Sequence, residues 1–187
     1  LCIFLYSASQ LAPICLKLTP ICLFFLLFYP YTKRFTFLCH YFLGVALAMA
    51  PAGGYIAVTG ELPFGIILLS GGVCLWIGSF DVIYGSQDRQ FDLDHKLHSM
   101  ATQFGVANAH KIAAFFHFIS ILCFIGAGIY FDLSFIYYIG VLIAILTLIY
   151  QHSLITPYDF SRLTQVYFMR NGIVSIVIFV FTLIDIL

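Results

Sequence analysis

The sequence predicts an all-α integral membrane protein, a multi-span helical bundle with about six to seven spans in one membrane domain over residues 1–187. Hydrophobic residues make up 63% of the chain and charged residues only 9%, which is far from the composition of a soluble domain. The mean hydropathy is +1.06, and the apolar runs are long enough to cross a bilayer as helices. Because these runs lack the alternation of barrel strands, helices are expected to span the lipid bilayer.

The N-terminal part has the least regular pattern. Residues 1–28 are predicted to hold the end of one helix and then a second helix, which is broken by Pro13, Lys17 and Pro20. Residues 29–36, which read YPYTKRFT, follow as a short polar hinge.

The remaining spans follow with polar or glycine-rich breaks between them. A helix is predicted over 37–54, where the sequence PAGG loosens its far end, and a turn over 59–63 (TGELP). The next span, 64–83, is rich in glycine, which lets helices pack closely. The later spans are predicted near 111–130, 134–151 and 171–187, with a polar loop over 152–170.

Charge and cysteine content narrow the classes of function. A net charge of zero without a basic patch argues against a nucleic-acid partner. The six cysteines are scattered through apolar segments without a C-x-x-C spacing, which predicts packing rather than metal binding. The chain begins at Leu1 inside an apolar run with no recognisable signal peptide, so we expect either that the protein has been cut or that the sequence begins within a gene.

The basic residues gather in loops on one side of the predicted bundle. If the spans alternate, the loops at 29–36, 84–111 and 152–170 share one membrane face. These loops hold seven of the eight basic residues, namely Lys33, Arg34, Arg89, Lys96, Lys111, Arg162 and Arg170. The opposite loops contain the acidic residues Glu61 and Asp132. The positive-inside rule therefore predicts that the basic face is cytoplasmic.

Half of the eight acidic residues lie within 81–99, which reads DVIYGSQDRQFDLDHKLHS. On a helix, five side chains of this stretch recur at steps of three and four and share one face: Asp81, Tyr84, Asp88, Asp92 and His95. Asp88 and Asp92 would lie one turn apart, with Cβ atoms about 5–6 Å from each other, so a cation is expected between them. Proteins hold Mg²⁺ through one or two carboxylates plus substrate phosphates, so we predict a Mg²⁺–diphosphate site.

Alternatives remain for each polar group. The acidic residues could serve merely to keep a loop between two membrane helices solvated. Alternatively, Asp92, His95 and His98 have a spacing that could bind zinc or iron. Lys33 and Arg34 could clamp diphosphate oxygens or form salt bridges with the acidic stretch. The other histidines are expected to make packing or hydrogen-bond contacts; they are His40, His110, His117 and His152.

Two motifs resemble the UbiA-type aromatic prenyltransferase family. YPYTKRFT, followed by Leu43 and Gly44, resembles the family's YPxxKRxT segment. DVIYGSQDRQFD followed by LHS is similar to the family's second aspartate motif, D-x₆-D-x₃-D, at Asp81, Asp88 and Asp92. The resemblance covers the chain from residue 29 onward.

The resemblance implies a nine-helix membrane enzyme with a central cavity, located in the bacterial inner membrane with its active-site loops facing the cytoplasm. It implies Mg²⁺ ligands at Asp88 and Asp92, and a diphosphate grip by Lys33 and Arg34. It also implies that Asp81 and Tyr84 line the cavity as catalytic residues, together with Arg34. The family's first motif, NDxxDxxxD, is not in this sequence, so the chain resembles the C-terminal two-thirds of such an enzyme.

The implied reaction transfers a polyprenyl group from a polyprenyl diphosphate to an aromatic acid such as 4-hydroxybenzoate in quinone biosynthesis. One alternative keeps this chemistry but uses an aromatic acceptor of the menaquinone pathway. Others are a transporter or ion-pathway fragment, in which the carboxylates bind a translocated cation, and a non-catalytic membrane remnant. A transporter is expected to place its acids or helix breaks at the bilayer midplane, whereas these lie at a helix end.

Overall fold

The computed structural model describes residues 2–156, 159–161, 163 and 169–187. This part of the chain is helical, and its only extended pairing is an isolated bridge between Thr156 and Asp159. The elements are α1 (Cys2–Ser9), α2 (Pro13–Phe28), η1 (Tyr29–Arg34), α3 (Cys39–Thr59), α4 (Phe64–Gly85), η2 (Ser86–Asp88), α5 (Arg89–Asp94), α6 (Met100–Phe104), α7 (Val106–Tyr130), α8 (Phe135–Leu154) and α9 (Met169–Ile186).

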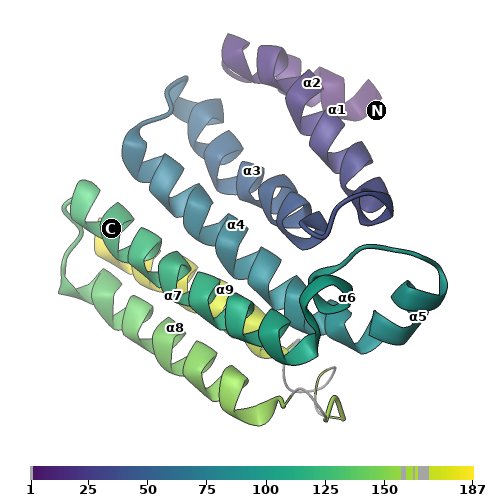
Figure 1. Ribbon diagram of the computed structural model, residues 1–187. Coiled ribbons are helices and arrows are strands. Elements are labelled where there is room, and N and C mark those ends of the chain that lie inside the picture. Colours follow the sequence, from purple (N-terminus) through teal and green to yellow (C-terminus); the bar gives the residue numbers. More distant parts are fainter. Residues whose placement is uncertain (1, 157–158, 162, 164–168) are drawn as a thin grey trace.

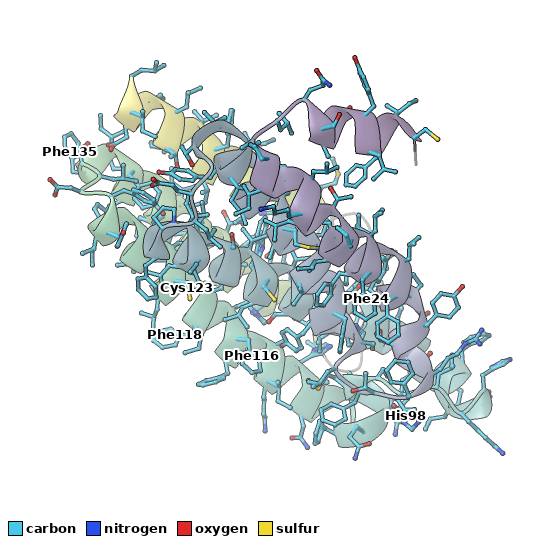
Figure 2. The ribbon with its side chains drawn as sticks, turned by 90° about the horizontal axis from the view of Figure 1, so that it is seen from above. Phe24, His98, Phe116, Phe118, Cys123 and Phe135 are labelled. Carbon is cyan, nitrogen blue, oxygen red and sulfur yellow. The ribbon has the colours of Figure 1, made fainter. Side chains whose placement is uncertain are left out.

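Six helical segments of the described chain are long and apolar enough to cross a membrane. They are Pro13–Arg34, Cys39–Thr59, Phe64–Asp94, Val106–Tyr130, Phe135–Leu154 and Met169–Ile186. The prediction of an all-α bundle with six to seven spans is therefore confirmed. Large apolar side chains project from the outside of the bundle, as Phe24, Phe118 and Phe135 do in Figure 2, where a bilayer would solvate them.

Helix α4 occupies the middle of the bundle. It packs against α3 on one side and α7 on the other, while α8 pairs with α9, and α2 packs against α3 (Figure 1). Two clusters of buried apolar residues fill the spaces between these helices, one around Val82, Ile83 and Ala109 and the other around Trp76 and Phe124. Helix α4 contributes to both clusters, so the polar residues near its end lie on a helix that is packed on both sides.

The polar connections gather at one end of the bundle. η1, α5, α6 and the end of α8 lie at this end, and the short turns between α3 and α4 and between α7 and α8 lie at the other (Figure 1). The backbone N–H of His98 donates to the Lys33 carbonyl oxygen at 2.7 Å, which ties η1 to the segment after α5. The Arg89 Nε donates to the Ala101 carbonyl oxygen at 2.9 Å and ties α5 to α6. The arrangement places both predicted motifs at the same end of the molecule.

Two predicted helices differ from those observed near the N-terminus. Helix α2 runs unbroken through Lys17 and Pro20, with Pro13 at its start, where a missing N–H costs nothing. Helix α3 continues past the PAGG sequence to Thr59 and ends at Gly60, which has a φ of 74°. A backbone in lipid must satisfy its polar groups internally, and this requirement favours a continuous helix over the break that proline and glycine suggest.

Three other boundaries also differ. Helix α7 begins at Val106, five residues before the predicted start, because Gly105, with a φ of 77°, ends α6 and leads directly into it. The short helix α6 was expected to be loop, and Ser99 and Thr102 form a reciprocal capping box at its start. The span predicted over 64–83 continues as a helical segment to Asp94. Much of the polar loop predicted over 152–170, including Arg162, lies outside the described residues.

Candidate functional site

A pocket with a volume of about 260 Å³ opens at the polar end of the bundle, where η1 and the start of α3 meet the end of α4 and η2. Its polar wall is made by Lys33, His40, Asp81, Tyr84 and Asp88, and its other lining residues are Tyr29, Pro30, Cys39, Leu43 and Gly85. Four of the six residues that the sequence singled out as site candidates therefore share one cavity. They come from two segments about fifty residues apart in the chain.

The acidic wall depends on helical geometry at the end of α4. Asp81 and Tyr84 lie one turn apart on α4, and the chain then tightens into the 3₁₀ turn η2, which ends at Asp88. The Ser86 hydroxyl donates to the Val82 carbonyl oxygen at 2.7 Å, so this turn is fixed against α4. The three side chains therefore face the same pocket, as the predicted spacing requires.

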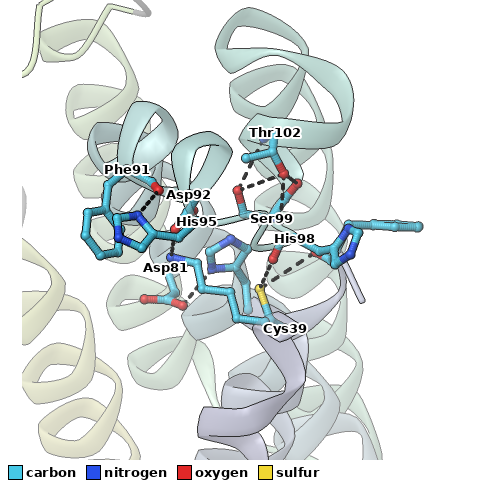
Figure 3. A network of polar contacts seen from close by, with 11 residues as sticks. Cys39, Asp81, Phe91, Asp92, His95, His98, Ser99 and Thr102 are labelled. Atoms are coloured by element: carbon cyan, nitrogen blue, oxygen red, sulfur yellow. Dashed lines mark hydrogen bonds and ion pairs between the residues drawn. The ribbon is translucent and has the colours of Figure 1, made fainter. Parts of the chain in front are cut away.

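Asp92 lies beyond the pocket wall and is fully buried. Its Oδ1 lies 2.7 Å from the Lys33 Nζ, while the Lys33 side chain is 29% exposed and also lines the pocket. The Asp92 Oδ2 is buried and has no hydrogen-bond donor among the described residues. Asp92 belongs to the polar network in Figure 3, together with Asp81 and the segment around His98. The Lys33 ammonium therefore connects this buried carboxylate to the pocket.

Asp81 has a second polar neighbour, His40, on α3. The Asp81 Oδ2 lies 2.7 Å from the His40 Nδ1, and the histidine is buried beside Gly85. A Cβ atom at Gly85 would lie 2.8 Å from the His40 Cε1, so the absence of a side chain there makes room for the ring. The sequence predicted packing or hydrogen-bond contacts for His40 but not its partner. No sequence spacing links it to Asp81, which is 41 residues away.

Arg34 lies apart from the pocket wall. Its side chain is exposed, and its guanidinium carbon lies 5.6 Å from the centre of the Tyr31 ring. Within the described chain, Arg34 makes no ion pair with the acidic stretch, whereas Lys33 does. The two neighbouring cations thus have different surroundings, and only Lys33 lines the cavity.

The histidines after Asp92 do not assemble into a metal centre. The His95 ring is exposed and stacks on the Phe91 ring with a centroid distance of 4.0 Å. His98 is exposed as well. In the part of the chain that the structure describes, no three His, Cys, Asp or Glu side chains come together as a metal-binding group. The expected shared face therefore ends at Asp88, because η2 interrupts the helix and both Asp92 and His95 lie outside the pocket lining.

The remaining histidines lie between helices, as the sequence predicts. The His117 Nε2 donates to the Trp76 carbonyl oxygen at 3.1 Å, which leaves its Nδ1 as the acceptor for the His152 Nε2–H at 2.8 Å. His110 is buried, with its ring edge-on to Phe160. These contacts join α4, α7 and α8 and lie outside the pocket lining.

Comparisons with known proteins give consistent results. The model of the UbiA prenyltransferase family matches residues 1–173. The 4-hydroxybenzoate octaprenyltransferase of Nitrosospira multiformis is 30% identical over 170 residues, which cover 91% of this chain and 58% of the relative. The enzyme of the same name from Shewanella sediminis is 32% identical over 146 residues, which cover 78% of this chain and 51% of the relative. The chain thus spans about half the length of the curated relatives that it matches.

A solved structure shows the same fold. The apo structure of a UbiA homolog from Aeropyrum pernix K1 aligns with a TM-score of 0.85 and 28% sequence identity. The alignment covers 100% of this chain and 69% of that chain.

Proposed function

The chain belongs to the UbiA prenyltransferase family, and we propose that its pocket serves the transfer of a polyprenyl group from a polyprenyl diphosphate to an aromatic acid such as 4-hydroxybenzoate. The observation that carries the proposal is the single cavity lined by Lys33, Asp81, Tyr84 and Asp88. The names of the curated relatives support the same donor and acceptor classes.

Asp88 and Asp92 would hold the magnesium ion. Asp88 is exposed to the pocket, and one turn later Asp92 keeps a buried oxygen without a hydrogen-bond donor among the described residues. Such an oxygen is costly to bury unless a cation or donor approaches it. When bound there, Mg²⁺ would neutralise charge on the leaving diphosphate, a role that suits its preference for carboxylates and phosphates.

The basic residues of η1 would hold the diphosphate. Lys33 presents its ammonium at the pocket wall, and Arg34 follows it in the same short helix. A guanidinium can donate two parallel hydrogen bonds to phosphate oxygens, and it stays charged throughout. The two cations would stabilise the negative charge that develops as the allylic C–O bond breaks and its electron pair leaves with the diphosphate.

Asp81 and Tyr84 would face the acceptor ring. The ring carbon attacks the allylic carbon, and a C–C bond forms as the C–O bond breaks. The ring then loses the proton from the attacked carbon, and the C–H electron pair restores aromaticity. Asp81 is the carboxylate best placed to take that proton. One of its oxygens is hydrogen-bonded to His40, while the Asp81 side chain remains 29% exposed at the pocket.

We also propose that the protein lies in the bacterial inner membrane with this pocket facing the cytoplasm. The support is the gathering of basic loops at the pocket end and the bacterial origin of the curated relatives. Water-soluble aromatic acids would then reach the pocket from the cytoplasm, while the isoprenoid tail would lie among apolar helices.

The experiment that tests the proposal is a transfer assay on membranes containing the protein. Octaprenyl diphosphate is supplied with labelled 4-hydroxybenzoate, in the presence of Mg²⁺ or of a chelator. We expect a prenylated acid only with Mg²⁺, and a parallel reaction with a hydroxynaphthoate measures acceptor preference. Membranes that contain folded protein but form no prenylated product with either acceptor would refute the proposal.

A further inference from the structure

We infer that His40 is a positioning residue that orients the Asp81 carboxylate for removal of the acceptor-ring proton. The inference rests on the proposed function and extends it to a residue on another helix. His40 lies in the first turn of α3, and Asp81 lies four residues before the end of α4. Their hydrogen bond therefore fixes the pocket carboxylate across a helix–helix interface rather than within one helix.

The hydrogen-bond pattern defines the direction of the interaction. The His40 Nε2 is buried and has no partner within the described chain, whereas the Nδ1 lies 2.7 Å from the Asp81 Oδ2. A carboxylate oxygen is an acceptor, and an imidazole proton is stabilised on the nitrogen that faces an acceptor. The Nδ1–H therefore donates to the Asp81 Oδ2. The other oxygen, Oδ1, has no hydrogen-bond partner among the described residues and remains available to the pocket.

The difference in burial assigns separate roles to the two side chains. His40 borders the pocket but is only 3% exposed; its Nε2 is buried and its Nδ1 is hydrogen-bonded to Asp81, so it presents no free polar atom to a substrate. The Asp81 side chain is 29% exposed at the pocket wall. Asp81 can therefore contact the acceptor ring, and His40 acts through it.

The environment of the ring limits its movement. Gly85 lies directly against it, with a hypothetical Cβ atom only 2.8 Å from the His40 Cε1. The preceding residue, Cys39, is also buried, and its thiol lies 3.5 Å from the His98 carbonyl oxygen (Figure 3). A donor held this firmly keeps the carboxylate in one orientation between turnovers. This matters because a proton acceptor must lie within hydrogen-bond reach of the proton that it removes.

In the proposed step, the new C–C bond has formed and the diphosphate has left with the electron pair of the C–O bond. The proton on the attacked ring carbon passes to the Asp81 Oδ1, and the C–H electron pair returns to the ring. His40 keeps its proton on Nδ1 throughout and neither gains nor loses charge. Its contribution is the orientation of the accepting oxygen.

The test compares two substitutions of His40 with the same substitutions of His110, a buried histidine on α7 outside the pocket lining. His40→Leu removes the donor, and His40→Gln retains an N–H that can reach Asp81. We expect His40→Leu to lower kcat about 100-fold, since a misplaced reacting group commonly costs this much, with KM for both substrates within twofold. His40→Gln should recover kcat to within about tenfold of wild type, and both His110 variants should stay within threefold.

Equal losses in His40→Leu and His40→Gln, or a change confined to KM, would overturn the positioning role while leaving prenyl transfer intact. Wild-type membranes without turnover would instead refute the proposed function, and the role of His40 would fall with it. A measurement that needs no variant of His40 is ¹⁵N NMR of the labelled histidines. It should show a protonated Nδ1 at His40 whose signal shifts in Asp81→Asn, and an unchanged signal would contradict the hydrogen bond.

Discussion

Lys33 and Asp92 form an ion pair in which one partner is buried and the other reaches the pocket. Asp92 is 0% exposed and has a single charged partner among the described residues, the Lys33 ammonium at 2.7 Å. A buried carboxylate depends on such a partner, because taking a charge out of water costs several kcal/mol. Lys33 therefore has a structural role as well as the proposed role towards diphosphate.

This dependence predicts that removing Lys33 alone destabilises the protein more than removing Lys33 and Asp92 together. Lys33→Met should lower the free energy of unfolding by up to about 3 kcal/mol, because it leaves the Asp92 charge buried without a partner. The double variant Lys33→Met/Asp92→Leu should recover most of that loss, since neither charge remains. Thermal unfolding in detergent without Mg²⁺ measures both. If the single and double variants unfold at the same temperature, the ion pair does not compensate the Asp92 charge.

Arg34 allows a sharper test of the diphosphate grip, because its side chain is exposed and makes no ion pair among the described residues. If its planar guanidinium binds phosphate oxygens through two hydrogen bonds, Arg34→Lys retains the charge but loses that geometry. We expect a fall in transfer rate of at least about tenfold, given that one preorganised donor commonly contributes about 10²–10³ in rate. The rate is normalised to folded protein in the membrane. A rate within about threefold of wild type would leave Arg34 without a part in catalysis.

At the scale of elements, the pocket depends on the close approach of α3 and α4. A Cβ atom at Gly44 of α3 would collide with the backbone carbonyl oxygen of Cys74 on α4. The two helices carry His40 and Asp81 one turn and about two turns from this crossing, respectively. Small residues at such contacts are what allow membrane helices to pack closely.

Gly44→Ala should therefore separate α3 from α4 and destabilise the protein. The matched control is Gly53→Ala on the same helix, where a Cβ atom meets nothing within 4 Å. The control should be neutral or slightly stabilising, because alanine favours a helix over glycine by about 1 kcal/mol. Unfolding temperatures in detergent distinguish the two. Equal effects of the two substitutions would show that the α3–α4 contact is not tight.

The same elements show how much of the site could be predicted from sequence. The helical spacing predicted that Asp81, Tyr84 and Asp88 share one face; α4 carries the first two, and the 3₁₀ turn η2 keeps Asp88 at the same pocket. Their association with His40 could not be predicted, since it depends on how α3 and α4 cross. The burial of Asp92 could not be predicted either. It depends on the 3₁₀ turn η2, which separates α4 from α5, where Asp92 lies.

Helix boundaries were predictable where the sequence changes from apolar to polar. The start of α4 at Phe64 and the end of α7 at Tyr130 agree with the predicted positions. The predictions were wrong where proline and glycine suggested a break, at Pro20 and around Pro51. Those residues weaken a helix in water, but an apolar surrounding offers the backbone no alternative hydrogen-bond partners.

At the scale of the whole molecule, the alternation of helices places the basic loops and the pocket at one end. The exposed Gln87 marks that end, and the exposed Glu61 marks the other, in the turn between α3 and α4. If the pocket end is cytoplasmic, the two positions lie on opposite sides of the membrane.

Cysteine labelling tests this orientation. In a variant without its native cysteines, Gln87→Cys should react with a membrane-impermeant thiol reagent only after the cytoplasmic side is opened. Glu61→Cys should react from the periplasmic side of intact cells. Labelling in the reverse pattern would invert the topology, and with it the proposed access of aromatic acids from the cytoplasm.

Asp88 and its neighbours are proposed to form a Mg²⁺-dependent binding site for a prenyl diphosphate. The most direct measurement is the equilibrium binding of a non-hydrolysable prenyl diphosphate analogue to the purified protein, with and without Mg²⁺. We compare wild type, Asp88→Asn and the control Asp132→Asn. Asp132 is an exposed aspartate in the α7–α8 turn, and its φ of 52° is a conformation that asparagine also tolerates. We expect Mg²⁺-dependent binding in wild type and Asp132→Asn, and binding at least about tenfold weaker in Asp88→Asn, because a metal-bound carboxylate is lost. Equal affinity in all three proteins, or affinity that does not depend on Mg²⁺, would rule out this binding site.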